Sequence, residues 1–209
     1  MANGEKDAKS FSRSIVSNCD YIICCDGAIS YLLAIGVIPD LLVGDMDSLD
    51  VNIIRALPKN METARYSTQK DETDLELAVT AAISKNPSQI IVLGAFGGRI
   101  DHELGNIHQL IRTADAGIDA FLLSNNTKLY VTKNELCLRK EKYNLISLIP
   151  ITTTVNGITT EGLNYALTNE DLKIGQTRGV SNTFISDIAK INVQSGYLLV
   201  ICSKNSFKL

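Results

Sequence analysis

Two aspartates, Asp45 and Asp47, follow a short apolar run at residues 41–43 and stand one residue apart. A hard cation such as Mg²⁺ prefers oxygen ligands, is usually held by one or two carboxylates, and takes its other ligands from water and substrate phosphates. The apolar run predicts a β-strand, and ligand sites of open α/β sheets lie at the carboxyl ends of such strands. The pair therefore suggests a metal site, although an acidic loop after a strand explains it equally well on its own.

A second group of charges fills four of the five positions 70–74, where Asp71 and Asp74 share one face of a predicted first helical turn. Apolar residues then recur with helical spacing up to residue 84. We expect Asp71 to be the N-cap of this helix and Asp74 to lie near the third position of a capping box. Capping and the helix dipole account for both acids, but four charges are more than a cap needs, which leaves a further role open.

A glycine-rich segment at 94–98 leads into Arg99, Asp101 and His102, between a predicted strand and a predicted helix. Glycines at such a junction let backbone N–H groups approach an anion at the helix N-terminus. The planar guanidinium of Arg99 also matches phosphate oxygens. A glycine-rich loop often does no more than turn the chain, but with Arg99 and Asp101 directly after it we predict a phosphate site.

Asp26 follows another predicted strand, at 21–25. Because parallel strands place their carboxyl ends at one edge of a sheet, Asp26 should share that edge with the other three groups. Acids that can hold a metal, together with Lys70, Arg99 and glycines that can hold phosphate, are the groups expected for phosphoryl-type transfer. Catalysis of that kind rests mostly on positioning and charge stabilisation.

Taken in order along nearly the whole chain, these motifs resemble those of the bacterial thiamine pyrophosphokinase family. The matching segments read Cys-Asp-Gly-Ala (25–28), Gly-Asp-Met-Asp-Ser (44–48), Asp-Glu-Thr-Asp (71–74), Gly-Gly-Arg-Ile-Asp-His (97–102), Thr-Thr-Glu-Gly-Leu-Asn-Tyr (159–165) and Gly-Val-Ser-Asn (179–182). The last two resemble the family's thiamine-side motifs. Two departures are residues 28–30, where the family more usually has Gly-Ala-Asn, and the opening strand, which is full-length in the family but here would have only two residues before Asn3-Gly4.

The resemblance implies transfer of the pyrophosphoryl group of ATP to thiamine, giving thiamine diphosphate and AMP. It implies Mg²⁺ and a catalytic set consisting of Asp45, Asp47, Asp71 and Asp74, which would hold the metal, and Arg99. The ATP-binding residues would be Asp26, Gly27, Ser48, Lys70, Thr73, Arg99, Asp101 and His102. The thiamine-binding residues would be Tyr165, Ser181 and Asn182. The working unit would be a homodimer with thiamine at the subunit interface.

Three alternatives use part of this pattern. A pterin pyrophosphokinase would share the N-terminal layout, but Tyr165 and the Ser181-Asn182 pair argue against a pterin acceptor. A metal-dependent phosphatase could use Asp45 and Asp47 as nucleophile and acid, but it would need a downstream lysine and further acids, and it would leave the loop at 97–101 without a role. A nucleotide sensor without activity is the third alternative, and nothing in the residues requires it.

Up to about residue 125 the chain alternates strands and helices, which predicts a mostly parallel sheet with helices on its faces. Strands are expected near 21–25, 41–44, 62–66, 90–95 and 118–123, and helices near 28–35, 50–57, 72–84 and 101–116. We therefore predict an α/β domain at 1–126 that carries the catalytic, Mg-ATP-binding site.

From residue 128 onward the sequence shows no convincing helix. Short β-type runs near 129–132, 145–149, 189–193 and 198–202 are separated by turn residues. Residues 194–196 are typical of a hairpin turn. We therefore predict that residues 127–209 form an all-β, thiamine-binding domain, a small sandwich.

The composition is that of an ordinary globular protein: 209 residues, 45% hydrophobic and 21% charged, with a net charge of −3. This charge gives no general attraction to nucleic acid or to an anionic membrane, and no apolar run approaches the length of a membrane span. The polar N-terminal residues lack the apolar core of a signal peptide. The five cysteines form no Cys-x-x-Cys pair, which favours free thiols in a reducing cytoplasm, and two histidines give little basis for a zinc site.

Overall fold

The computed structural model describes residues 1–47, 49–59, 61–67 and 69–204. The chain divides into two compact units, the first made of residues 1–109 and 123–125 and the second of residues 110–122 and 126 onward. Within the described residues, no helix is long and apolar enough to cross a membrane.

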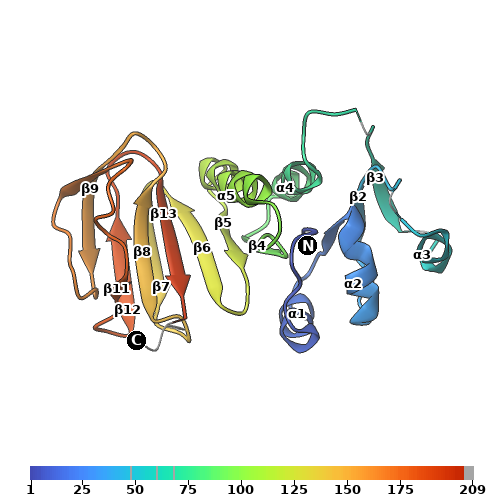
Figure 1. Cartoon of the computed structure of the whole chain (residues 1–209), viewed down its shortest axis with the longest axis horizontal. Coiled ribbons are helices and arrows are strands. Elements are labelled where there is room, and N and C mark those ends of the chain that lie inside the picture. The colour runs from blue at the N-terminus through green and yellow to red at the C-terminus, as the bar shows by residue number, and fades with distance from the viewer. Residues whose placement is uncertain (48, 60, 68, 205–209) are drawn as a thin grey trace. The chain divides into compact units, whose positions relative to one another are not determined.

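The first unit is built on parallel strands with helices between them (Figure 1). Its strands are β1 (Ile23–Cys25), β2 (Leu41–Gly44), β3 (Glu62–Arg65) and β4 (Gln89–Leu93), of which β4 is not part of the β1-β2-β3 sheet. Its helical elements are α1 (Lys9–Val16), the 3-10 turn η1 (Asp26–Ala28), α2 (Ile29–Ala34), α3 (Val51–Ala56), α4 (Asp74–Ser84) and α5 (Ile100–Asp115), which continues along the chain into the second unit. The first three strands pair in the order β1-β2-β3, all parallel.

The central strand β2 is buried along its whole length. Helix α4 packs against β1 and β2. Burial of consecutive residues, on both faces of the strand, is what a parallel sheet covered by helices requires. The predicted parallel α/β arrangement of the N-terminal part is confirmed.

The N-terminal backbone forms hydrogen bonds with two strands. The Met1 amino group donates to the Ile23 carbonyl at 2.7 Å and the Cys25 N–H donates to the Met1 carbonyl at 2.9 Å. On the other side, the Ala2 N–H donates to the Leu93 carbonyl at 2.8 Å. Residues 1 and 2 thus provide the extended backbone expected before Asn3-Gly4, and they join β1 to β4.

Helix α1 was not predicted from the sequence. Its residues are mostly polar, and only Ser12 and Val16 within it are buried. The helix is fixed by a distant contact, because the Tyr31 hydroxyl lies 2.7 Å from the Asp7 carbonyl and 2.9 Å from the Ser12 hydroxyl. A short, mostly polar segment fixed by tertiary hydrogen bonds gives little apolar signal in the sequence.

After the end of α5 the second unit consists of strands, and the all-β character predicted from residue 128 onward is confirmed, whereas β5 (Asp119–Leu123) was expected in the α/β domain. The strands that follow β5 are β6 (Thr127–Thr132), β7 (Glu135–Arg139), β8 (Leu145–Pro150), β9 (Thr154–Glu161), β10 (Glu170–Lys173), β11 (Asn182–Thr183), β12 (Ile188–Asn192) and β13 (Leu198–Ser203). One sheet has the order β10-β9-β12-β7, and the other contains β11-β8-β13-β6-β5. Alternate residues are buried, for example Ile146 and Leu148 of β8 and Ala189 and Ile191 of β12, which is the pattern of two sheets that share a core.

The predicted hairpin at 194–196 is wrong. Strand β12 pairs with β7 and β9, whereas β13 pairs with β6 and β8, so the turn carries the chain from one sheet to the other. The turn is held against β9: the Asn156 N–H donates to the Ser195 carbonyl at 2.9 Å, and a Cβ atom at Gly196 would lie 2.6 Å from the Thr154 carbonyl oxygen. The turn residues were recognised, but the strand that holds them is β9, whose Asn156 lies 39 residues from Ser195 in sequence and gives no local signal.

Candidate active site

Asp26 and Asp45 follow two neighbouring strands at the same edge of the sheet. Cys25 at the end of β1 pairs with Val43 of β2, and Asp26 is buried, with 5% of its surface exposed. A Cβ atom at Gly44 would lie 2.5 Å from the Asp26 Cβ. Glycine is therefore needed there, because any side chain would displace the Asp26 carboxylate.

The turn that carries Asp45 and Asp47 has an unusual backbone. The Asp47 N–H donates to Asp45 Oδ1 at 3.1 Å. Between them Met46 has a φ of +64°, a conformation that non-glycine residues adopt rarely and at a cost of about 1–3 kcal/mol. Met46 is buried and its sulfur accepts from Arg65 Nε at 3.3 Å, so side-chain packing holds this strained turn. No sequence signal pointed to Met46.

The third acidic group lies around the start of α4, but its cap differs from the prediction. Thr73, not Asp71, is the N-cap: its Oγ1 accepts from the Glu76 N–H at 3.2 Å, and the helix begins at Asp74. Both residue types cap helices well, so the local sequence allowed two starts. Asp71 consequently lies outside the helix with its side chain exposed.

An ion pair joins Lys70 to Asp74, with Lys70 Nζ 2.5 Å from Asp74 Oδ1. The Lys70 side chain is 15% exposed and that of Asp74 35% exposed, so this pair is only partly screened by water. In this state the ammonium neutralises the carboxylate. Binding of a phosphate by Lys70 or of a cation by Asp74 would therefore separate the two groups.

The glycine-rich loop between β4 and α5 already binds a carboxylate. Glu103 Oε1, in the first turn of α5, accepts from the Gly97 N–H at 2.7 Å, and Asn106 Nδ2 donates to the Ala95 carbonyl at 2.8 Å. The Gly97 N–H therefore points to a position that suits an anion. Glu103 was not singled out from the sequence, because its partner is a backbone group that only the folded loop exposes.

The same loop is packed tightly at one glycine and is open at the next. Gly97 has a φ of +78°, and a Cβ atom there would lie 2.3 Å from the Glu5 Cβ. Gly98 has a φ of +104°, with no atom within 4 Å of its Cβ position. The open side of Gly98 leaves room for a ligand.

Replacing Gly97 by alanine should lower the free energy of unfolding of the first unit by about 1–3 kcal/mol, because φ and the Glu5 contact both oppose a side chain. Gly105 within α5 is the matched control: its Cβ position is open and its φ is not positive, so Gly105→Ala should stabilise the helix by about 0.5–1 kcal/mol. Urea unfolding of both variants measures the difference. Equal effects of the two substitutions would contradict this account of the loop.

Arg99 and Asp101 form a two-point ion pair, with Nε–Oδ1 at 3.1 Å and Nη2–Oδ2 at 2.5 Å. The hydrogen bonds from Arg99 lower the pKa of Asp101. Both side chains are largely exposed, and a pair of this kind contributes little to stability. The guanidinium can therefore leave Asp101 for a phosphate at little cost. His102 is also exposed, and its backbone N–H donates to Asp101 Oδ1 at 3.0 Å.

The N-terminal residues hold the Asp26 turn and the glycine loop together. A Cβ atom at Gly27 would lie 2.1 Å from Asn3 Nδ2, and the Glu5 N–H donates to the Phe96 carbonyl at 2.6 Å. Asn3 and Glu5 thus touch two of the four predicted groups. The sequence had marked Asn3-Gly4 only as the end of an opening strand.

The acids do not converge on a ready-made cage. Within the described residues no group of three or more His, Cys, Asp and Glu side chains is placed to hold a metal ion. The donor chemistry still fits Mg²⁺, which commonly uses one or two protein carboxylates and completes its shell with water and phosphate. Asp45 and Asp47 on one turn supply such a pair, whereas Ser48 lies outside the described residues.

In the second unit the structure brings Tyr165 and Asn182 together. Asn182 is buried, and its side chain bonds to the Tyr165 backbone. The Tyr165 side chain itself is 70% exposed. Ser181 is exposed with a φ of +62°, and its N–H donates to the Ser147 hydroxyl at 3.0 Å.

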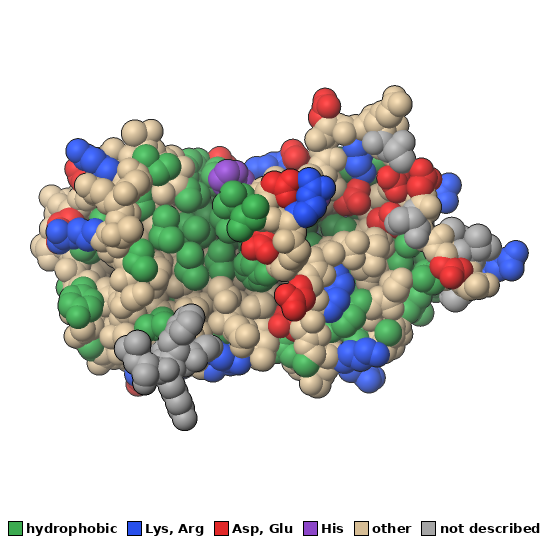
Figure 2. Space-filling model, viewed as in Figure 1, with side chains coloured by type: hydrophobic (Ala, Val, Ile, Leu, Met, Phe, Trp, Pro, Cys, Tyr) green, Lys and Arg blue, Asp and Glu red, His purple; other side chains and the backbone are tan. Residues whose placement is uncertain are grey.

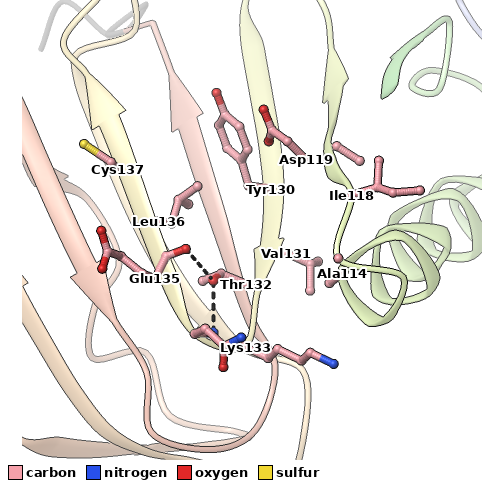
Figure 3. A pocket seen from close by; sticks show the side chains of 13 residues that line it. Ala114, Ile118, Asp119, Tyr130, Val131, Thr132, Lys133, Glu135, Leu136 and Cys137 are labelled. Carbon is pink, nitrogen blue, oxygen red and sulfur yellow. Dashed lines mark hydrogen bonds between the residues drawn. The ribbon is translucent and has the colours of Figure 1, made fainter. Parts of the chain in front are cut away.

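A separate pocket of 360 Å³ lies in the second unit, between α5 and the strands β5, β6 and β7 (Figure 3). It contains none of the residues predicted from the sequence. Tyr130 and Leu136 are apolar side chains in its lining. Lys133 also lines it and forms an ion pair with Asp115, with Lys133 Nζ 2.8 Å from Asp115 Oδ1. On the face seen in Figure 2, hydrophobic side chains reach the surface over strands of the second unit, and many acidic side chains lie over the first.

Comparison with known proteins gives a consistent result. Residues 12–122 match the family model described as thiamin pyrophosphokinase, catalytic domain, and residues 133–198 match the vitamin B1 binding domain of thiamin pyrophosphokinase. Over 175 residues the chain is 32% identical to a thiamine pyrophosphokinase of Bacillus subtilis (strain 168), covering 82% of each chain. A crystal structure of thiamine pyrophosphokinase from Bacillus subtilis superimposes with a TM-score of 0.87 at 28% identity, over 98% of this chain and 97% of that one. One from Geobacillus thermodenitrificans gives 0.87 and 28%, over 99% and 97%.

Proposed function

Because the chain belongs to the thiamine pyrophosphokinase family, we propose that it transfers the pyrophosphoryl group of ATP to the hydroxyethyl oxygen of thiamine, giving thiamine diphosphate and AMP. The observation that carries the proposal is the glycine-rich loop between β4 and α5, where the Gly97 N–H already holds a carboxylate two residues before a releasable Arg99. The loop can bind one phosphate group through its backbone N–H, and Arg99 can bind a second one through its guanidinium. Together they suit a polyphosphate.

On the nucleotide side, we assign Asp26, Gly27, Ser48, Lys70, Thr73, Arg99, Asp101 and His102 to ATP. Lys70 and Arg99 would leave their aspartate partners and stabilise the negative charge that develops as the bridging oxygen departs. Thr73 is the N-cap of α4 and so fixes where the helix starts. This helps to position Lys70, which precedes Thr73, and Asp74, which follows it. Glu103 would give up the Gly97 N–H to a phosphate oxygen.

We assign Asp45, Asp47, Asp71 and Asp74 to Mg²⁺, whose bound charge would offset that of the phosphates. The strained Met46 turn sets the spacing of the first two carboxylates. We also assign to Asp71, which is exposed and lies outside the helix, the acceptance of the alcohol proton of thiamine. Since an ionised aspartate is a weak base toward an alcohol, we expect positioning of the two substrates to supply most of the acceleration.

For thiamine, we assign Tyr165, Ser181 and Asn182, in the all-β domain that we place at 127–209, with the α/β domain at 1–126. A tyrosine ring can face the positive thiazolium or stack on the pyrimidine. We propose a homodimer with thiamine at the subunit interface. The second unit supports this assembly, because it carries several exposed apolar side chains: Tyr165, Ile174, Val180, Ile185 and Ile188.

We place the enzyme in the cytoplasm. All five cysteines are free thiols, two of them exposed, and exposed thiols persist where the compartment is reducing. Burial raises the pKa of Cys25 to about 11, so this residue next to Asp26 is an inert packing group and not a nucleophile.

The nucleotide product tests the reaction. Attack at the β-phosphorus releases AMP, so chromatography of a reaction with Mg-ATP and thiamine should show AMP and thiamine diphosphate in equal amounts. Stoichiometric ADP would contradict pyrophosphoryl transfer. Omitting thiamine is the control, since a phosphatase would still release orthophosphate, and replacing thiamine by a hydroxymethyl pterin tests the pterin alternative.

A further inference from the structure

We infer that Asn182 is a positioning residue, which holds the backbone of Tyr165 so that its ring faces thiamine, and that Asn182 does not contact thiamine itself. The inference rests on the proposed function, because it takes Tyr165 as a thiamine contact. It changes the role of Asn182 from a direct thiamine contact to a support for the aromatic ring.

The hydrogen bonds of Asn182 are directed at the backbone of its neighbours. Its Oδ1 accepts from the Tyr165 N–H at 2.9 Å and from the Thr183 N–H at 2.9 Å. Its Nδ2 donates to the Tyr165 carbonyl at 2.8 Å. The two donors on one side and the acceptor on the other fix which end of the amide is oxygen.

These bonds leave little of the side chain for a ligand. An amide oxygen has two lone pairs, and both are used. Asn182 is 3% exposed, so the remaining Nδ2 hydrogen has almost no access to the surface. Ser181, by contrast, has an exposed side chain and can reach a ligand directly.

Tyr165 needs such a support because the residue is 70% exposed, so packing does little to fix its ring. Its backbone continues a short antiparallel ladder: the Asn164 N–H donates to the Thr183 carbonyl at 2.9 Å, and the Ile185 N–H donates to the Gly162 carbonyl at 3.0 Å. Asn182 extends this ladder by one residue with its side chain. Two bonds to one residue, at its N–H and its carbonyl, fix the direction of the Cα–Cβ bond and hence of the ring.

A double-mutant cycle tests the inference. Tyr165→Ala should raise the KM for thiamine by about five- to tenfold, as expected for a lost ring contact, and Asn182→Ala should raise it by a similar or smaller factor. Neither should change the KM for ATP. In the double variant Asn182→Ala/Tyr165→Ala, the KM for thiamine should be less than about twofold higher than in Tyr165→Ala alone, because the ring through which Asn182 acts is absent. The inference would be overturned if the KM factors of the two single variants multiplied in the double variant. It would also be overturned if the KM for ATP rose as much as the KM for thiamine.

Asn182→Asp decides the question even if the alanine variant does not fold. The carboxylate keeps the acceptor for the Tyr165 and Thr183 N–H groups but places an acceptor against the Tyr165 carbonyl, so the KM for thiamine should rise. If Asn182 touched the cationic substrate, a carboxylate should strengthen binding, and a lower KM would overturn the inference.

Asn156→Ala is the matched control. Asn156 is an exposed asparagine of the same unit, whose Nδ2 donates to the Ser195 hydroxyl at 2.8 Å, and this variant should keep the KM for thiamine of the unchanged protein. Thiamine diphosphate formation by the unaltered protein distinguishes failure of the proposed function from failure of the positioning role of Asn182. If this protein forms no thiamine diphosphate the proposed function fails, whereas an active protein with additive Asn182 and Tyr165 effects removes only the positioning role.

Discussion

Replacing Asp47 by asparagine is expected to lower the turnover number by about 100-fold or more, the size of effect seen when one electrostatic stabiliser of a transition state is lost. The substitution keeps the volume and removes the charge. Asp47 is exposed and follows the Met46 turn, so its carboxylate is not part of the core and the fold should survive the substitution. Asp45→Asn and Asp74→Asn should act in the same direction.

Asp50→Asn is the matched control for this series. Asp50 lies three residues further on, and its Oδ1 accepts from the Asn52 N–H at 2.7 Å at the start of α3. Asparagine caps a helix as well as aspartate does, so this variant should keep both its activity and its thermal midpoint. Near-normal turnover of Asp47→Asn at saturating Mg²⁺ would refute the assignment of Asp47.

Asp74→Asn has an additional consequence because of its partner. The amide would leave Lys70 without the charge that it now neutralises at 2.5 Å. The Lys70 side chain is mostly buried, and a buried ammonium without a counter-charge is costly. Loss of activity in this variant therefore combines a missing carboxylate with a displaced lysine, and Asp47→Asn is the cleaner test.

The strands of the first unit could be predicted because their signals are local. Apolar runs end in a glycine or an aspartate, as at Gly44-Asp45 and Cys25-Asp26, and the strands end where these residues stand. The start of α4 was misplaced because Asp71 and Thr73 are both good caps. The local sequence therefore does not decide between them, and in the fold Thr73 is the cap of the helix that packs against β1 and β2.

The contacts that build the candidate site could not be predicted, because they join positions distant in sequence or use backbone groups. Glu103 reaches back to the Gly97 N–H, and Asn3 packs against Gly27. The motif at 179–182 was found from its residue types, but the burial of Asn182 was not, since its partner Tyr165 lies 17 residues away. The residue type predicts that the side chain forms hydrogen bonds, whereas the fold decides whether its partner is a ligand or the backbone.

Mixed subunits should recover activity if the working site is shared between two chains. One parent would carry Asp47→Asn, which disables the phosphate side. The other would carry Tyr165→Ala with Ser181→Ala, which weakens the thiamine side. The second pair is chosen because both side chains are exposed, so the fold should survive, whereas a substitution at buried Asn182 would risk unfolding the β domain.

In a homodimer with two shared sites, each mixed dimer contains one site with both alterations and one site with neither. Random exchange of equal amounts makes half of the dimers mixed, so the activity should rise to about one quarter of that of the unaltered protein. The assay uses a thiamine concentration below the KM for thiamine of the second parent, so that each parent alone has very little activity. Tagged subunits purified in tandem show that mixed dimers have formed.

Subunits that each contain a complete site give a different result. Mixed dimers would then show only the mean of the two parents, because no site would gain an intact half from its partner. That outcome, or sedimentation of the active enzyme as a monomer, would refute the shared site. The exposed apolar side chains near Tyr165, such as Ile185 at 68% exposure, would then need another explanation, whereas recovery of activity would place them against the partner subunit beside the thiamine ring.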